Sequence, residues 1–141
     1  MMSARPLILV ADDDEDILQL VALRLSRTGY DVLTARDGAA AIELAFARKP
    51  DVAVLDVTMP RLDGIEVMHA LRSKEGMAAI PVLLLTARAQ PADVERGLAA
   101  GANDYVTKPF SPEVLAQRVA SLLEIAGEMA EPVPALRAVA L

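Results

Sequence analysis

Three apolar runs that lack polar alternation constrain the fold of this chain more than any other feature of its sequence. They cover residues 7–11, 52–55 and 82–86. A strand with one solvated face alternates apolar and polar side chains, whereas a strand buried on both faces of a parallel sheet does not. The runs therefore predict three central strands, and two weaker runs at residues 31–35 and 104–108 predict strands nearer the sheet edges.

Amphipathic segments that suit helices follow each of these strands. They cover approximately residues 15–28, 39–48, 65–73, 92–100 and 112–126. Gly29 and Gly101 stand where a residue in the left-handed conformation would end the first and fourth helices. Ser111 followed by Pro112 is typical of a helix N-cap with proline at the first helical position. Strict alternation of five strands and five helices predicts an α/β fold with a doubly wound parallel sheet.

The composition fits one domain with an aliphatic core. The chain has 141 residues, of which 54% are hydrophobic but only 3% are aromatic. The first predicted helix contributes a packing face made of Ile17, Leu20, Val21 and Leu25. Because the chain contains no cysteine, disulfide scaffolds, thiolate zinc sites and cysteine nucleophiles are excluded.

The charge of the chain argues against two classes of partner. The formal net charge is −6 at pH 7, so the basic surface that nucleic acids and anionic membranes require is missing. The longest uncharged run, residues 76–87, is too short to span a bilayer, and the N-terminal segment does not fit a signal peptide. We therefore expect a cytoplasmic protein that binds neither a membrane nor a nucleic acid directly.

Polar residues that suit phosphoryl chemistry stand where the predicted strands end. Asp12 and Asp13 follow the first strand, Asp56 the third, Thr86 ends the fourth and Lys108 ends the fifth. Taken singly, such residues are commonly helix caps, turn residues or solvated surface charges. Ligands of open parallel sheets, however, bind at the carboxyl ends of the strands, where all five would meet.

The five residue types together suit one task. Carboxylates from two strands repel each other unless a cation lies between them, and carboxylate oxygen is what Mg²⁺ prefers. A lysine neutralises a phosphoryl group, a threonine hydroxyl donates to its oxygen, and an aspartate is a competent nucleophile for it. The strand ends therefore predict a site that accepts a phosphoryl group.

The sequence resembles the receiver domains of two-component response regulators over nearly its whole length. Four blocks in the right order carry the resemblance: residues 8–13, residues 56–60 with 63–64, residues 86–87, and residues 101–110. The resemblance implies a flavodoxin-like fold with strand order 2-1-3-4-5. It also implies a receiver domain at residues 5–126, followed by a linker or flexible C-terminal tail at residues 127–141.

The resemblance assigns a role to each residue of the acidic cluster. Asp56 would accept a phosphoryl group from a sensor histidine kinase or a phosphotransfer protein. Asp13 would bind Mg²⁺ (or Mn²⁺) directly, Asp12 directly or through water, and the backbone carbonyl of Thr58 would complete the protein ligands. The chain would be no enzyme beyond its own phosphorylation and dephosphorylation.

The resemblance also implies how the phosphorylated state is read. Lys108 would contact the phosphoryl group, and the Lys108–Pro109 bond is expected to be cis. Thr86 would move toward the phosphoryl group and let Tyr105 turn from an exposed to an inward rotamer. A downstream target, or an output domain missing from this chain, would respond.

A homodimer is left open. The DNA-binding subfamily dimerises through its fourth helix, fifth strand and fifth helix with ion pairs between subunits, and Asp104 and Arg118 match one such pair. Apolar residues stand where other charged members of that set are expected, namely Val94, Ala100, Val114 and Ile125. Asp104 and Arg118 can equally be ordinary exposed charges.

Two other functions compete with phosphoryl reception. Phosphatases of the haloacid dehalogenase type use a strand-end aspartate but need a second acid two residues later, where this chain has Thr58. An interaction module that has kept the fold but lost phosphorylation is the main alternative, although the chain retains all five residues of the site.

Overall fold

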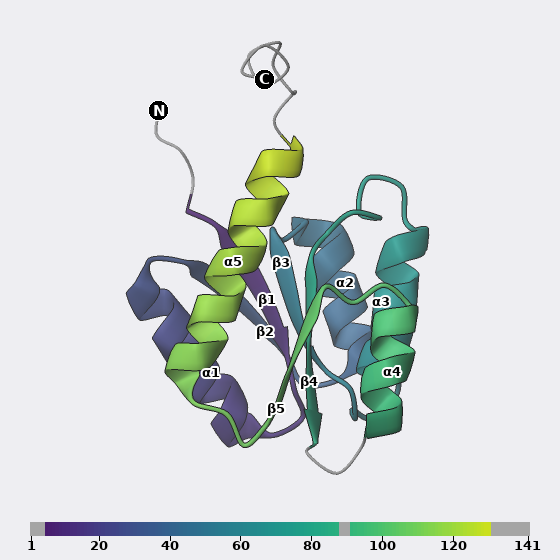
Figure 1. Ribbon diagram of the computed structural model, residues 1–141, viewed down its shortest axis with the longest axis horizontal. Helices are drawn as coiled ribbons and strands as arrows, with labels where there is room; N and C mark the ends of the chain where they lie inside the picture. The colour runs from purple at the N-terminus through teal and green to yellow at the C-terminus, as the bar shows by residue number, and fades with distance from the viewer. Residues whose placement is uncertain (1–4, 88–90, 131–141) are drawn as a thin grey trace.

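Five parallel strands form one sheet in the order β2-β1-β3-β4-β5, as predicted (Figure 1). The computed structural model describes residues 5–87 and 91–130. The strands are β1 (Leu7–Ala11), β2 (Asp31–Ala35), β3 (Val52–Asp56), β4 (Val82–Ala87) and β5 (Asp104–Lys108). Every neighbouring pair runs parallel, so the carboxyl ends of all five strands lie along the same edge of the sheet.

Five helices cover the two faces of this sheet. They are α1 (Glu15–Thr28), α2 (Gly38–Arg48), α3 (Gly64–Ser73), α4 (Pro91–Ala99) and α5 (Pro112–Ala130). Helices α1 and α5 cover one face, and α2, α3 and α4 cover the other (Figure 1). The prediction of a doubly wound α/β fold with five helices is therefore correct. Within the described residues, no helix is long and apolar enough to cross a membrane.

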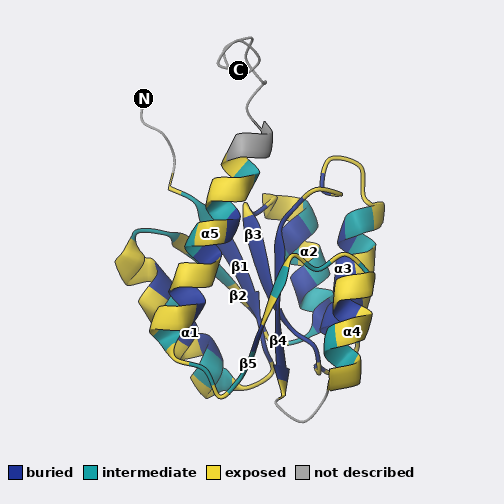
Figure 2. Ribbon diagram, viewed as in Figure 1, coloured by how far each residue is buried: buried dark blue, intermediate teal, exposed yellow. Residues whose placement is uncertain are grey.

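The unbroken apolar runs are buried on both faces because their residues alternate between two cores. Ile8 and Val10 of β1 belong to the core beneath α1 and α5, whereas Leu9 and Ala11 belong to the core beneath α2 and α3. All five residues of β3 are buried (Figure 2). Both cores consist mainly of aliphatic side chains, as the low aromatic content requires.

The predicted packing face of α1 is wrong at one position. Leu20 is 49% exposed, and Leu18 lies in the core in its place. Leu18, Val21 and Leu25 follow the three- and four-residue spacing that keeps side chains on one face of a helix. Leu20 is two positions from Leu18, which turns it by about 200° away from the sheet.

The helix ends follow the predicted signals, with one exception. Gly29 and Gly101 both adopt a φ of 113°, and the Ser111 hydroxyl accepts the Val114 N–H at 3.0 Å. Helix α5 continues past its predicted end at residue 126 and runs through Gly127 to Ala130. A single glycine costs a helix about 1 kcal/mol, which good helix formers on either side can offset. The rest of the predicted tail, residues 131–141, lies outside the described residues.

Candidate functional site

The carboxyl edge of the sheet brings together three aspartates. Asp12 and Asp13 follow β1, and Asp56 is the last residue of β3, the neighbouring strand. One carboxylate oxygen from each lies within 4.8 Å of the others. Asp12 and Asp56 are buried, whereas Asp13 is exposed, so the cluster opens to solvent on one side.

Lys108 lies between the two buried carboxylates. Its ammonium nitrogen is 2.9 Å from Oδ2 of Asp12 and 3.2 Å from Oδ2 of Asp56. The lysine reaches them from β5, which is separated from β3 by β4. The bond from Lys108 to Pro109 is cis, as expected. One cation thus faces the carboxylates of two strands.

Burial and charge shift the pKa of both partners in this cluster. Burial, with the negative charge of Asp12 as a second cause, raises the pKa of Asp56 to about 7, although Lys108 opposes the shift. Burial alone would lower the pKa of Lys108, but hydrogen bonds and charge from the two aspartates outweigh it and raise the pKa. Because three carboxylates face one ammonium, the ionised cluster carries more negative charge than Lys108 balances, and it favours a second cation.

The run of five acidic residues after β1 divides between two tasks. Asp12 faces the cluster, and its Oδ1 accepts the N–H of Asp14 at 2.9 Å. Asp14 is the N-cap of α1, because its Oδ1 accepts the N–H of Asp16 at 2.9 Å and of Ile17 at 3.3 Å. The capping interpretation therefore applies to Asp14, whereas Asp12 and Asp13 belong to the carboxylate cluster.

The loop after Asp56 is held close to the carboxylate. The N–H of Thr58 donates to Oδ1 of Asp56 at 3.3 Å, and Thr58 is exposed at the rim of the cluster. Gly64, the first residue of α3, packs so tightly that a Cβ there would lie 2.3 Å from the backbone oxygen of Asp56. In the sequence, Gly64 stands out only as part of the block formed by residues 56–60 with 63–64. A glycine directly after the capping Asp63 was the available signal for this close approach.

Thr86 and Tyr105 lie on neighbouring strands but in different environments. Thr86 is buried at the carboxyl end of β4, where it pairs in register with Thr107 of β5. Its hydroxyl is 3.4 Å from the carbonyl of Ala87, which leaves it free to find a stronger acceptor. Tyr105 is 38% exposed. Tyr105 is thus not among the residues that the ion pairs of Lys108 with Asp12 and Asp56 bring together.

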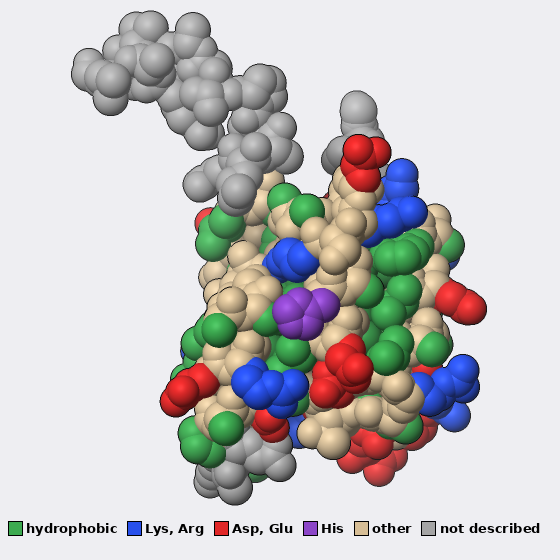
Figure 3. All heavy atoms as spheres, turned by 90° about the vertical axis from the view of Figure 1, so that its right-hand side faces the viewer, with side chains coloured by type: hydrophobic (Ala, Val, Ile, Leu, Met, Phe, Trp, Pro, Cys, Tyr) green, Lys and Arg blue, Asp and Glu red, His purple; other side chains and the backbone are tan. Residues whose placement is uncertain are grey.

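The single histidine lies outside this site. His69 is exposed on α3, and it appears on the surface seen in Figure 3. The described residues contain one cluster of acidic or histidine ligands that could hold a metal ion, and His69 is not part of it.

The chemistry of the aspartate cluster fits a magnesium ion. Three carboxylates supply hard oxygen ligands within 4.8 Å of one another, and the exposed side of Asp13 leaves room for water. Mg²⁺ typically combines a few carboxylates with several waters or phosphate oxygens. Three carboxylates surround the single ammonium of Lys108, so the cluster is short of positive charge. The residues present therefore suit Mg²⁺ or Mn²⁺.

Comparison with known proteins decides the family. The family model described as response regulator receiver domain matches residues 8–120, which include the whole cluster. The chain belongs to this receiver domain family. The sequence therefore identified both the family and the fold correctly.

Relatives of this receiver domain are transcriptional regulators and chemotaxis proteins. The chain is 49% identical over 125 residues to the alkaline phosphatase synthesis transcriptional regulatory protein PhoP of Bacillus subtilis, covering 89% of this chain and 51% of PhoP. It is 46% identical over 118 residues to the DNA-binding dual master transcriptional regulator RpaA of Synechocystis, covering 84% of this chain and 49% of RpaA. The chain thus spans about half the length of these curated relatives.

Solved structures of similar proteins share the fold over almost their full length. The chemotaxis response regulator CheY4 of Vibrio cholerae is 34% identical with a TM-score of 0.80, covering 84% of this chain and 99% of CheY4. The receiver domain of the Francisella response regulator 1452 is 38% identical with a TM-score of 0.78, covering 85% of this chain and 98% of that domain.

The raised pKa of Asp56 predicts how stability depends on pH in the metal-free protein. The folded-state pKa of about 7 lies above the ordinary value of 3.8, so folding favours the protonated carboxyl. This stabilisation is complete below pH 3.8 and is lost as the pH rises through about 7. We expect the free energy of unfolding of the wild type, relative to Asp56→Asn, to fall in EDTA as the pH rises from 3.8 through about 7.

Urea unfolding of both proteins across this pH range, with EDTA and then with Mg²⁺, measures the difference. Mg²⁺ should flatten the curve, because a cation at the carboxylate lowers its pKa. Parallel curves for the two proteins in EDTA would contradict the raised pKa.

Proposed function

We propose that this receiver domain accepts a phosphoryl group on Asp56 from a phosphohistidine of a sensor histidine kinase or phosphotransfer protein. The reaction requires Mg²⁺ or Mn²⁺, and the phosphorylated domain controls a downstream partner or output domain. One observation supports this above all: a buried strand-end carboxylate shares the Lys108 ammonium with Asp12, beside the exposed Asp13.

The proposed step is a displacement at phosphorus. A carboxylate oxygen of Asp56 forms a bond to phosphorus while the bond from phosphorus to the donor imidazole nitrogen breaks and its electron pair stays on the nitrogen. The product is an acyl phosphate on Asp56. Lys108 already lies 3.2 Å from Asp56 and needs little movement to pair with a phosphoryl oxygen.

The metal ion would be held by Asp12, Asp13 and Asp56, with the backbone carbonyl of Thr58 as a fourth protein ligand. When bound, it would neutralise charge on the transferring phosphoryl group. Asp12 is fixed for this role, because its other oxygen is engaged by the N–H of Asp14. Asp13, at the exposed side, faces the water from which the ion arrives.

The function is tested by phosphoryl uptake. We expect the wild-type chain to gain one phosphoryl group when incubated with acetyl phosphate and Mg²⁺, measured by intact-mass spectrometry. Uptake should be lost when EDTA replaces Mg²⁺ and should return with Mn²⁺. Uptake that is indifferent to EDTA would contradict the assignment of the aspartate cluster.

Thr86 and Tyr105 are proposed to couple phosphorylation to the surface. A phosphoryl group supplies the strong acceptor that the Thr86 hydroxyl lacks, and movement of Thr86 would open space for Tyr105. Phosphorylation would thus favour one of two existing conformations.

We expect Thr86→Ala to keep phosphoryl uptake while the response of Tyr105 is largely lost, because the methyl group cannot donate to the phosphoryl oxygen. Fluorotyrosine NMR measures this response directly, since Tyr30 and Tyr105 are the two tyrosines of the chain and Tyr30 serves as the internal reference. A Tyr105 signal that shifts equally in wild type and variant would remove Thr86 from the switch.

The remaining parts of the proposal concern partners. PhoP and RpaA are named as transcriptional regulators, and this chain matches about half of each. The output that this receiver controls, and the absence of direct nucleic-acid contact by the receiver itself, stay predictions. Arg118 pairs with Asp104 of the same chain at 2.8 Å, so this pair is already satisfied within one protomer. A homodimer that uses it across subunits would first have to break this contact.

A further inference from the structure

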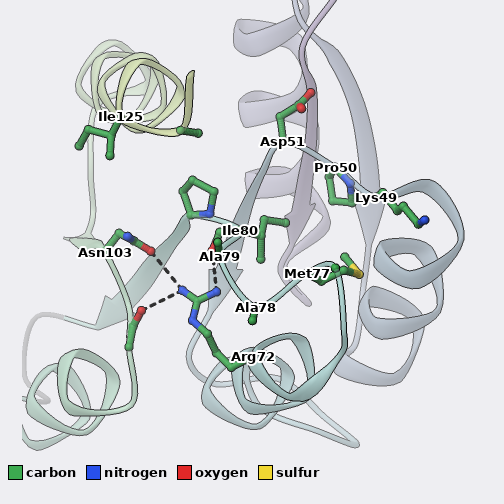
Figure 4. A pocket seen from close by; sticks show the side chains of 14 residues that line it. Lys49, Pro50, Asp51, Arg72, Met77, Ala78, Ala79, Ile80, Asn103 and Ile125 are labelled. Carbon is green, nitrogen blue, oxygen red and sulfur yellow. Dashed lines mark hydrogen bonds between the residues drawn. The ribbon is translucent and has the colours of Figure 1, made fainter. Parts of the chain in front are cut away.

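A cavity of about 570 Å³ opens at the edge of the sheet opposite to Asp56 (Figure 4). Asp51, Pro81 and Asn103, which precede β3, β4 and β5, contribute to its wall together with Ile125 near the end of α5. A five-residue strand such as β3 spans about 16 Å, so this cavity is separate from the acidic cluster.

Arg72 of α3 brings to this cavity a positive charge that is not paired with a carboxylate of the described residues. Its guanidinium donates to the backbone oxygens of Ile80 at 2.6 Å and Gly101 at 2.8 Å, and to Oδ1 of Asn103 at 3.2 Å. All three acceptors are neutral. In the described part of the chain, no carboxylate oxygen lies within 4.0 Å of Arg72. Burial lowers the pKa of Arg72, as expected for a cation removed from water without a counter-ion.

The guanidinium has N–H donors that form no hydrogen bond within the described residues. It has five N–H groups, and the hydrogen bonds to Ile80, Gly101 and Asn103 account for three. Within the described residues, Nε donates to no acceptor. A Cβ at Gly101 would lie 3.3 Å from this nitrogen, so a glycine at this position lets the loop approach the guanidinium closely. Arg72 therefore offers an anionic ligand both a positive charge and N–H donors that are not yet used.

The rest of the wall is mainly apolar. Pro81 and Ile125 line it with Met77 and Ile80, and Ile125 is 46% exposed although it is aliphatic. Two more charged residues, Lys49 and Asp51, line the cavity, and Oδ2 of Asp51 accepts the N–H of Leu7 at 2.8 Å. The charges of Lys49 and Asp51 offset each other, so the lining carries one net positive charge, that of Arg72. A monoanion with an apolar body therefore matches this wall better than a multiply charged phosphate.

We propose that this cavity binds a small organic carboxylate, with its carboxylate on Arg72 and its apolar body against Ile80, Pro81 and Ile125. The volume lies in the range of about 300–1,000 Å³ that is usual for small-molecule sites. The site is separate from the proposed phosphorylation site, because it shares no residue with the acidic cluster at the other edge of the sheet.

Binding is tested on the unphosphorylated chain by NMR titration with hexanoate. We expect saturable shifts of the Arg72 Nε–H and of backbone amides around the cavity. Hexanamide, which has the same shape without the charge, should bind roughly tenfold more weakly or worse, because a charge-assisted hydrogen bond is lost. Equal binding of both compounds, or shifts that never saturate, would overturn the proposal.

Two variants test whether hexanoate binds in this cavity. Arg72→Gln removes the charge and should abolish hexanoate binding. Because Arg72 also ties three segments together, Ile125→Glu is the second variant: it leaves Arg72 in place and puts a negative charge at the rim, which should weaken binding at least about fivefold. Val114→Glu, at another exposed apolar position of α5 outside this cavity, is the matched control and should bind normally.

The occupant is distinguished by two further probes. Inorganic phosphate that competes with hexanoate at equal concentration would show a general anion site and overturn the requirement for an apolar body. A glutamate-containing hexapeptide that saturates the cavity when hexanoate does not would assign it to a protein partner and overturn the small-ligand proposal.

Discussion

Asp56→Asn is expected to abolish phosphoryl uptake completely while the chain stays folded. The amide has nearly the shape of the carboxylate but lacks the nucleophilic oxygen that must bond to phosphorus. The substitution also removes one negative charge from a buried cluster, where Asp56 carries a raised pKa of about 7. The variant should therefore be at least as stable as the wild type in EDTA at pH 8, which separates loss of chemistry from loss of fold.

The measurement is intact mass after incubation with acetyl phosphate and Mg²⁺, one adduct for the wild type and none for Asp56→Asn. Asp63→Asn is the matched control, because Asp63 also follows β3 but serves as the N-cap of α3, where asparagine caps nearly as well. It should take up phosphate as the wild type does. An adduct of equal yield on Asp56→Asn would move the acceptor to another residue.

The elements of this fold could be predicted because doubly buried strands leave a distinct mark on the sequence. In a chain of this size, an apolar run such as residues 52–55 is buried on both faces only as a central strand of the sheet. A polar residue stands at the end of each of these runs. Once the strands are parallel, their ends must meet, so the convergence of Asp12, Asp56 and Lys108 follows from topology. The order of the strands needed the family resemblance, because local pattern does not specify which strands pair.

The parts that sequence could not settle are those where adjacent residues are chemically alike. Five consecutive acids follow β1. The family resemblance selected Asp12 and Asp13 for the cluster, but residue type alone did not, and the folded chain adds that Asp14 caps α1. In α1, Leu18 and Leu20 are the same residue type two positions apart, and only the position of the sheet decides which is buried. The sequence also could not show that Arg72 lacks a carboxylate partner among the described residues, because the neutral groups that it contacts come from other segments of the chain.

Lys108→Met is expected to destabilise the metal-free protein by about 3 kcal/mol at pH 8, because removing one partner leaves buried charges uncompensated. Methionine keeps most of the apolar stem of lysine but not the ammonium that lies 2.9 Å from Asp12 and 3.2 Å from Asp56. The loss of stability should become smaller toward pH 5. Asp56, whose pKa is raised to about 7, is then protonated and no longer repels Asp12. Lys49→Met, at an exposed lysine, is the control and should change stability by less than about 0.5 kcal/mol.

The double variant Lys108→Met with Asp56→Asn decides whether this account is right. If Lys108 stabilises the fold mainly by balancing two carboxylates, then removing the charge of Asp56 should restore most of the loss, and the two substitutions should be strongly non-additive in urea unfolding. Mg²⁺ should restore stability to Lys108→Met in the same way, because it would supply the missing positive charge to the aspartates. If the double variant were instead as unstable as the sum of the two single effects, Lys108 would contribute through packing alone. The proposed role of its ammonium in phosphoryl transfer would then lose its structural basis.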